Sequence, residues 1–333
     1  MAKAPAQWAA EVVTMAKTRG RYDVVIVGGG GTGLSAALML GRARRSVLVV
    51  DGGQPRNAPA GHLHAFLSRD GMPPGELLEI GRREVAGYGG EVVAGQVESV
   101  TGTSGDFTVE LGDGTTAHAR RLLVASGLVD ELPPVRGLAA RWGRDVLHCP
   151  YCHGWEVRDQ AIGVLATDTP MALHQAELFR QWSADVTLLL HTAPKPADAA
   201  LERLTALGIP VVPDEVTSVT VTGDRLSGVR LASGMAIPLD ALTVAPRFTA
   251  RADFLAPLGP APVPHPTGMG TYLAAGADGR TEVPGVWAAG NITNPSAQVL
   301  ASAAAGATAA GAINADLITE DAEHALKEWR NAL

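Results

Sequence analysis

The chain has 333 residues, of which 46% are hydrophobic and 18% are charged, and this composition excludes a disordered chain or a coiled coil. The length predicts about two domains, and the net charge of −7 leaves no basic surface typical of a nucleic-acid-binding protein. No apolar run approaches the ~20 residues of a membrane span. Residues 1–20 lack the apolar stretch of a signal peptide, so we expect a cytosolic protein with no membrane partner.

A strand, turn, helix and strand open the first predicted domain. The apolar run 23–27 predicts a strand, residues 34–44 predict a helix, and residues 46–50 predict a second strand that ends at Asp51. A glycine-rich turn, Gly28-Gly29-Gly30-Gly31-Thr32-Gly33, joins the first strand to the helix. This order is typical of a βαβ unit that binds a dinucleotide.

The residue types in this turn have physical reasons. Gly28 allows the tight turn, Gly30 lets the backbone approach a pyrophosphate, and Gly33 lets the helix and strand pack closely. The helix N-terminus offers N–H donors and a partial positive charge to the phosphates. Asp51 is placed to accept hydrogen bonds from ribose hydroxyls.

The rest of this domain is predicted as a long loop followed by a helix and short strands. Residues 52–75 are polar and irregular, and a loop of this length is often functional, although a solvated crossover remains the alternative. Ala125-Ser126-Gly127 ends the last strand and predicts a crossing between domains. The predicted elements are a helix at 75–87, strands at 91–93, 97–101, 107–111 and 119–124, and a hairpin turn at 112–114.

A second unit repeats the pattern of the first. Residues 161–166, 170–183 and 185–190 predict strand, helix and strand, and further strands are expected at 210–212, 216–221 and 226–231. The chain then returns through residues 242–246 to a last strand at 285–291 and a helix at 296–317. We predict an α/β fold of two three-layer Rossmann-like domains: an extension of residues 1–22, a discontinuous first domain of residues 23–127 and 246–333, and a second domain of residues 128–245.

Cys149 and Cys152 are the two cysteines of the chain, and His153 follows them directly. In a cytosolic chain, C-x-x-C indicates redox chemistry or metal binding. C-x-x-C-H is also the attachment pattern of haem c, but that chemistry needs export. A zinc site needs four ligands, and only His148 and His153 are nearby. CPYC occurs in glutaredoxins, whose fold is smaller, and two buried structural thiols are the remaining alternative.

These motifs, in this order, resemble the low-molecular-weight thioredoxin reductase family of flavoproteins. The resemblance covers residues 23–317 and implies that the first domain holds FAD, that the cysteines form a flavin-linked disulfide, and that the protein is a homodimer without a metal. The family usually has Asp where this chain has Asn291, so a flavin contact without the charge is expected there. The expected cofactor-binding residues are Gly28, Gly30, Gly31, Thr32, Gly33, Asp51, Gly52, Arg56, Asn57, His64, Ala125, Ser126, Gly127, Gly290, Asn291 and Gln298.

The second unit departs from the pattern of relatives that bind NADPH. Ala166, Asp168 and Met171 stand where the first unit has glycines, and the carboxylate of Asp168 would face a pyrophosphate. The arginine cluster that grips a 2′-phosphate is replaced by the segment 191–195, His-Thr-Ala-Pro-Lys. The sequence therefore predicts no NADPH site, and binding through a divergent loop remains the alternative.

His153 is the other departure, because thioredoxin reductases have Asp after the second cysteine. Cys-x-x-Cys-His-Gly resembles the subgroup of dithiol oxidases that close disulfides in holomycin, gliotoxin and romidepsin. An imidazole suits a base that takes protons from thiols, although a structural role for His153, or a share for His148, stays open.

The resemblance implies an FAD-dependent oxidase that converts a small-molecule dithiol to an intramolecular disulfide and passes the electrons to O₂, giving H₂O₂. Such an enzyme would act in the biosynthesis of a dithiolopyrrolone-type natural product or in self-protection. The alternatives are a disulfide reductase that uses NADPH or ferredoxin, and a non-catalytic flavoprotein that senses redox state.

Overall fold

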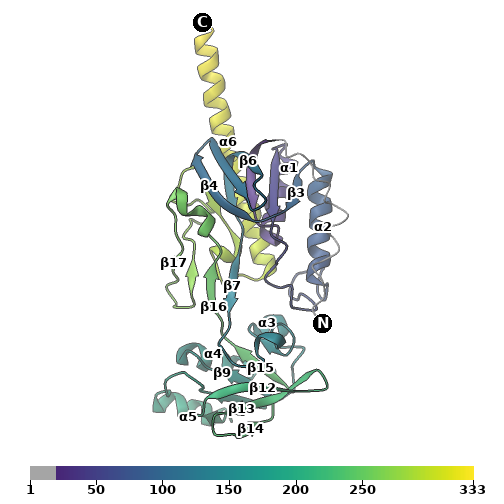
Figure 1. Cartoon of the computed structure of the whole chain (residues 1–333), viewed down its shortest axis with the longest axis vertical. Helices are drawn as coiled ribbons and strands as arrows, with labels where there is room; N and C mark the ends of the chain where they lie inside the picture. The colour runs from purple at the N-terminus through teal and green to yellow at the C-terminus, as the bar shows by residue number, and fades with distance from the viewer. Residues whose placement is uncertain (1–19) are drawn as a thin grey trace. The chain divides into compact units, whose positions relative to one another are not determined.

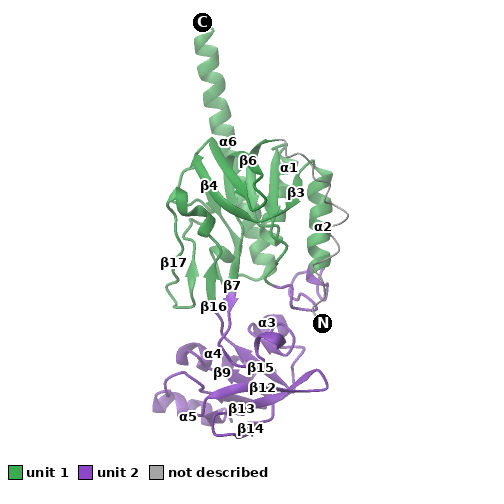
Figure 2. Cartoon of the chain, viewed as in Figure 1, with its two compact units in different colours: residues 1–56, 75–129, 248–333 green, residues 57–74, 130–247 purple. Residues whose placement is uncertain are grey.

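The computed structural model describes residues 20–333, so most of the predicted N-terminal extension lies outside the described residues. The chain divides into two compact units, and Figure 2 shows their course along the chain. Among the described residues, unit 1 comprises residues 20–56, 75–129 and 248–333, and unit 2 comprises residues 57–74 and 130–247. Residues 57–74, which the sequence analysis places in the first domain, group with the second unit in the structure.

Unit 1 is built around one mixed sheet (Figure 1). The strand order is β3-β2-β1-β6-β5-β4. The strand β19 also pairs with β6, at residues 122–124, beyond the stretch 116–119 that pairs with β5. The strands β3, β2, β1, β6 and β19 run parallel. The hairpin predicted at 112–114 joins β5 to β6. The elements are β1 (Arg21–Val27), α1 (Gly31–Arg42), β2 (Val47–Asp51), α2 (Pro74–Gly87), β3 (Glu91–Ala94), β4 (Val97–Thr103), β5 (Asp106–Leu111), β6 (Thr116–Val124), η3 (Asp253–Leu258), β17 (Val263–Pro264), β18 (Thr271–Tyr272), β19 (Val286–Ala288), η4 (Gly290–Ile292) and α6 (Val299–Asn331).

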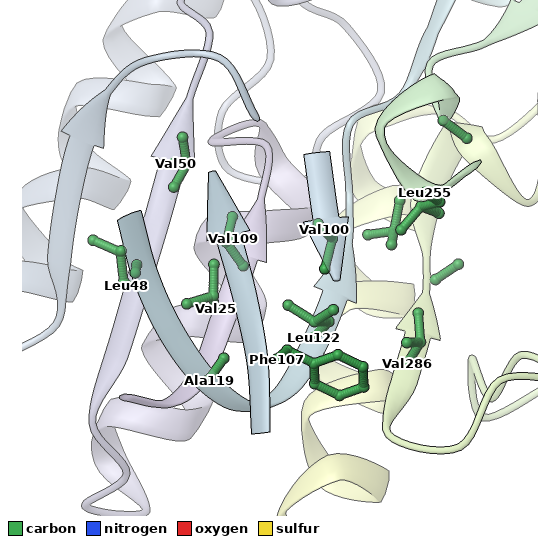
Figure 3. Close-up of a cluster of buried hydrophobic side chains, with 14 of the residues drawn as sticks. Val25, Leu48, Val50, Val100, Phe107, Val109, Ala119, Leu122, Leu255 and Val286 are labelled. Carbon is green, nitrogen blue, oxygen red and sulfur yellow. The ribbon is translucent and has the colours of Figure 1, made fainter. Parts of the chain in front are cut away.

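Alternation along the strands divides the core of unit 1 into two clusters. Val24 and Ile26 pack with the helices α1 and α6, whereas Val25 belongs to the other cluster. Figure 3 shows that second cluster, in which Val25, Leu48 and Val50 lie with side chains from β5, β6 and η3. Since successive residues of a strand point to opposite faces, the fully apolar run 24–27 buries both faces of the sheet.

Unit 2 carries a smaller parallel sheet in the order β11-β10-β9-β15-β8, and a three-stranded antiparallel sheet in the order β12-β13-β14. The strand, helix and strand predicted from residue 161 onwards are β9, α4 and β10. The elements are η2 (Ala139–Arg141), β8 (Val146–Leu147), α3 (Pro150–His153), β9 (Ile162–Leu165), α4 (Thr169–Phe179), β10 (Val186–Leu189), α5 (Asp198–Ala206), β11 (Val211–Val212), β12 (Val216–Thr222), β13 (Arg225–Leu231), β14 (Ala236–Ile237) and β15 (Ala241–Val244).

Besides the excursion of residues 57–74, the chain crosses between the units through β7 (Leu128–Glu131) and β16 (Arg247–Ala250), and these two strands pair with each other. The crossing through β7 follows directly on Ala125-Ser126-Gly127, where the sequence predicts it. The return that the sequence predicts through residues 242–246 begins in β15, which ends at Val244, and the chain then enters β16.

Helix α6 is longer than the sequence analysis expects. The predicted end at Leu317 is the last buried residue of the helix, but the helix continues to Asn331 with its side chains exposed from Asp321 onwards (Figure 1). Eight of residues 318–331 are strong helix formers: two Ala, three Glu, one Leu, one Lys and one Arg. Glu320 and Asp321 also form ion pairs with Arg121 and Arg120 of β6, so the extension is helical without burying apolar side chains. No helix among residues 20–333 is long and apolar enough to span a membrane.

The contact between α1 and α6 depends on a glycine. A Cβ atom at Gly306 of α6 would overlap the carbonyl group of Thr32 in α1, whereas a Cβ atom at Gly311 of the same helix would meet only the side chain of Met39, at 3.5 Å. We expect Gly306→Ala to lower the free energy of unfolding by about 1–3 kcal/mol, because the two backbones would have to move apart.

The matched control is Gly311→Ala, which we expect to be neutral or to stabilise the protein by up to about 1 kcal/mol, since alanine is the better helix former. Urea unfolding of both variants and the wild type measures the difference. Equal stabilities of the two variants would contradict the close contact at Gly306.

Candidate active site

The glycine turn of unit 1 leaves the N-terminus of α1 open to an anion. Gly28 has φ of 112°, a conformation that L-residues rarely adopt, and a Cβ there would overlap the carbonyl oxygen of Ala125. Gly30 is the N-cap of α1, no side chain caps the helix, and its first turn holds no acidic residue. A Cβ at Gly30 would meet nothing within 4 Å. These residues therefore fit a pyrophosphate held by backbone N–H groups.

Asp51 lies at the end of β2 and is buried. Its Oδ1 accepts a hydrogen bond from the backbone N–H of Gly53 at 3.0 Å, and its Oδ2 accepts one from the guanidinium of Arg82 at 2.8 Å. Because a carboxylate has about four acceptor positions, it can still accept hydrogen bonds from ribose hydroxyls, which stays a prediction. The sequence analysis missed Arg82, which α2 places beside Asp51 and which no motif marks.

Asn291 closes the turn that precedes α6. Its side-chain N–H₂ group lies within donating distance of the carbonyl oxygens of Ala297 at 2.8 Å, Asn294 at 3.2 Å and Pro295 at 3.4 Å. An aspartate has no N–H group and would present a carboxylate to these oxygens. The structure thus gives a reason for Asn at this position.

Arg56 reaches the same turn from the loop after β2. Its Nη1 donates to the carbonyl oxygen of Pro295 at 3.2 Å, and its guanidinium lies 4.7 Å from the centre of the Phe248 ring. Phe248 carried no signal in the sequence. Arg56 and Asn291, which lie far apart in the sequence, therefore both contact the backbone of residues 294–297.

Gly31, Thr32 and Gly33 form the first turn of α1, whereas Ser126, Gly127 and Gln298 take part in hydrogen bonds with nearby backbone. The hydroxyl of Ser126 donates to the carbonyl oxygen of Arg251 at 2.6 Å, and the Arg251 N–H donates to the carbonyl oxygen of Gly127 at 3.1 Å. Gln298 is the N-cap of α6 and accepts a backbone hydrogen bond from Ser302 at 2.8 Å. Asn57 and His64 belong to unit 2, apart from the rest of the predicted cofactor residues. Their contact with the cofactor stays a prediction.

The cysteine pair stands on one turn of helix in unit 2. Cys149 is the N-cap of α3, and Pro150 occupies the first helical position, where its missing N–H costs no hydrogen bond. The backbone N–H groups of Cys152 and His153 both donate to the carbonyl oxygen of Cys149 at 3.2 Å. This turn brings the two sulfur atoms to 2.8 Å from each other.

His153 ends the same turn with its ring in the protein interior. Both ring nitrogens are buried, and neither has a hydrogen-bond partner among residues 20–333. Burial lowers the pKa of His153 from its ordinary value of 6.5, while the charge of Glu156 raises it and that of His64 lowers it. His153 is therefore neutral near pH 7, and a neutral imidazole can accept a proton from a thiol.

His148 flanks the cysteines on the other side and is held differently. Its Nδ1 lies 3.2 Å from the carbonyl oxygen of Val244 and 3.5 Å from Nε2 of Gln175. The hydrogen bond to Val244 orients the ring with a proton on Nδ1.

The repeat in unit 2 lacks the open helix terminus of unit 1. Asp168 is the N-cap of α4, and its carboxylate accepts a hydrogen bond from the N–H of Met171 at 3.0 Å. The carboxylate thus occupies the position where a phosphate would bind. His191 opens the segment that stands where relatives that bind NADPH have an arginine cluster. Its Nδ1 accepts a hydrogen bond from the N–H of Val216 at 3.2 Å. Burial lowers the pKa of His191, so this ring supplies no positive charge for a 2′-phosphate.

A match to a known family model covers most of the chain. Residues 22–311 match the pyridine nucleotide-disulphide oxidoreductase model, and the chain belongs to that family. The fold is that of thioredoxin reductases, and the protein is an FAD-binding oxidoreductase.

Three relatives illustrate this membership. The crystal structure of HlmI is 45% identical, with a TM-score of 0.88, over 94% of this chain and 98% of that chain. The crystal structure of an oxidoreductase from Agrobacterium tumefaciens is 36% identical, with a TM-score of 0.84, over 90% of this chain and 99% of that one. The thioredoxin reductase sirT of Leptosphaeria maculans is 30% identical over 320 residues, which are 90% of this chain and 95% of that protein.

The capped terminus of α4 yields a prediction about NADPH. We expect ~0.1 mM NADPH, a concentration on the order of a typical KM, to leave the bound flavin oxidised for much longer than the second or so in which a functional reductase would bleach it. The measurement is anaerobic stopped-flow absorbance, with dithionite as the control that the flavin is reducible. Asp168→Gly should not restore reduction, because the cationic clamp would still be missing. Bleaching of the wild type within about a second would show a working NADPH site.

Proposed function

We propose that the protein is an FAD-dependent oxidase that converts a small-molecule dithiol to its intramolecular disulfide, with O₂ reduced to H₂O₂. The observation that carries the proposal is the pair of Cys149 and Cys152, with their sulfur atoms 2.8 Å apart, followed on the same turn by a neutral His153 whose two ring nitrogens are buried. An aspartate, nearly always ionised at neutral pH, would be a much weaker base for a thiol.

The chain's own residues perform a thiol–disulfide exchange in this proposal. His153 accepts the proton of the first substrate thiol, and the resulting thiolate attacks Sγ of Cys149 in the Cys149–Cys152 disulfide. The bond between the two enzyme sulfurs breaks, and Cys152 leaves as a thiolate. The second substrate thiol then attacks the mixed disulfide, so that the substrate disulfide forms and Cys149 is released. Which cysteine is attacked is taken from the family resemblance.

The electron balance needs an acceptor for the reduced pair. Bound FAD supplies it, since a flavin takes two electrons from a dithiol and can return them to O₂. The sum is one dithiol and one O₂ giving one disulfide and one H₂O₂. With O₂ as the final acceptor, no nicotinamide site is required, in keeping with the carboxylate of Asp168 at the N-terminus of α4.

A thioredoxin reductase-like activity is the second candidate, because the relative from Leptosphaeria maculans carries the name thioredoxin reductase. It would take electrons from NADPH or ferredoxin and run the exchange in the opposite direction. The capping carboxylate of Asp168 and the uncharged ring of His191 favour the oxidase over the NADPH-dependent form. The test with NADPH separates the oxidase from the NADPH-dependent reductase.

The proposal includes a cellular setting. We place the enzyme in the cytoplasm as a homodimer, with a role in natural-product biosynthesis or self-protection. The family resemblance supports this setting. The overall charge of −7 favours a small-molecule substrate over nucleic acid.

Each cysteine should be indispensable. We expect Cys149→Ser and Cys152→Ser to abolish oxidation of dithiothreitol, because the exchange needs both sulfurs, while the FAD content stays at that of the wild type. The measurements are O₂ uptake and flavin absorbance. Turnover by either variant at a rate close to that of the wild type would show that dithiols reduce the flavin without the cysteine pair.

His153 should set the pH dependence. We expect His153→Ala to lower kcat/KM by ~10²–10⁴ at neutral pH, the usual contribution of a positioned base. In the wild type the acidic limb of kcat/KM should lie below pH 6.5, because burial lowers the pKa of His153 and the ring must be neutral to act. The loss should shrink above pH ~8.5, where a substrate thiol ionises unaided. An acidic limb that persists unchanged in His153→Ala would move the base to another residue, with His148 the next candidate.

A further inference from the structure

His64 lies between two carboxylates in unit 2. Its Nδ1 is 3.3 Å from Oδ1 of Asp70, and its Nε2 is 3.3 Å from Oε1 of Glu156. Asp70 belongs to the same loop, whereas Glu156 follows α3 and lies three residues beyond His153 in the sequence. The contact between His64 and Glu156 therefore joins the segment 57–74 to the turn that carries the cysteine pair.

The loop holds the ring of His64 in place. Asp70 Oδ1 also accepts the backbone N–H of Ala65 at 3.0 Å, and the buried Leu63 exchanges backbone hydrogen bonds of 2.9 Å with Gly71 and Met72. These bonds pin both ends of residues 63–72 to each other. His64 consequently presents Nε2 to Glu156 from a fixed backbone.

His153 has no hydrogen bond of its own that fixes its charge. Among the described residues, Glu156 and His64 are the charged groups that act on its ring, Cys149 and Cys152 lie on its own turn, and Asp70 acts behind His64. Glu156 favours the protonated ring, and a positive charge on His64 opposes it. Because Glu156 and His64 contact each other, the charge of each also limits the effect of the other on the ring of His153.

We propose that His64 and Glu156 are positioning residues for the reaction: an imidazole–carboxylate pair in ion-pair contact beside the turn of the cysteines, which controls the charge on the ring of His153. This role rests on the proposed function of His153 as the base, and it differs from the flavin contact that the sequence predicts for His64. Without Glu156 the protonated ring of His153 should lose its second proton at lower pH, and without His64 it should keep that proton to higher pH.

The test follows the titration of His153 directly, so it does not depend on turnover. The FAD-loaded wild type, Glu156→Gln and His64→Gln are labelled at histidine, and the ring resonance of His153, identified by its loss in His153→Ala, is followed against pH by NMR. We expect Glu156→Gln to move the midpoint down by about one pH unit and His64→Gln to move it up by a similar amount. His62→Gln is the matched control, because His62 lies on the same loop with its ring 6.4 Å from that of His64, and the midpoint should not move.

The activity of the same variants separates this proposal from the proposed function. The acidic limb of kcat/KM with dithiothreitol should move in the same directions as the midpoints. Midpoints that shift as expected in an enzyme that oxidises no dithiol would keep the charge control and reject the oxidase. Unchanged midpoints, or shifts of the same sign in both variants, would overturn the role of the pair. Loss of FAD from His64→Gln with an unchanged midpoint would likewise overturn it and assign His64 to the cofactor.

Discussion

The first turn of α1 is packed so closely that at least four glycines in and around it have no room for a side chain. A Cβ at Gly28 would overlap the carbonyl oxygen of Ala125, a Cβ at Gly33 would overlap that of Gly28, and a Cβ at Gly290 or at Gly306 would overlap Thr32. These contacts connect the ends of β1 and β6 with α1, η4 and α6, which come from all three chain segments of unit 1. The same packing leaves the helix terminus at Gly30 open, so the predicted pyrophosphate site and the closure of the unit depend on one constraint.

Unit 2 repeats the order strand, helix and strand, but a side chain caps the N-terminus of its helix. Glycine at the N-cap of α1 leaves the N–H groups to a ligand, whereas Asp168 at the N-cap of α4 satisfies one of them and brings a negative charge. The topology is therefore the same although the terminus of α4 is already capped. In unit 2 the proposed chemistry lies at α3, where one helical turn carries both cysteines and His153.

Much of the fold was predictable because each pattern is local. The apolar run 23–27, the glycine turn and Asp51 specify the first βαβ unit within about thirty residues. The turn at 112–114 specifies the hairpin of β5 and β6. The end of α6 was not predictable from the core pattern, because the residues after Leu317 bury no apolar side chain and are helical through propensity and a few ion pairs near Glu320. Arg82, Phe248 and Glu156 lay outside every motif, since they meet the predicted residues only through the fold.

The sequence by itself indicated the family and the cofactor, because its motifs, in their order, resemble those of the thioredoxin reductases. It also predicted a redox pair at Cys149 and Cys152 and a base at His153, because C-x-x-C-H places these residue types within one turn. Only the tertiary structure decided the surroundings of these groups: that the nitrogens of His153 are buried with no partner among residues 20–333, that Asn291 closes a turn of carbonyl groups, and that His64 contacts Glu156. Burial and charge at a side chain depend on residues far away in the chain, and no local spacing encodes them.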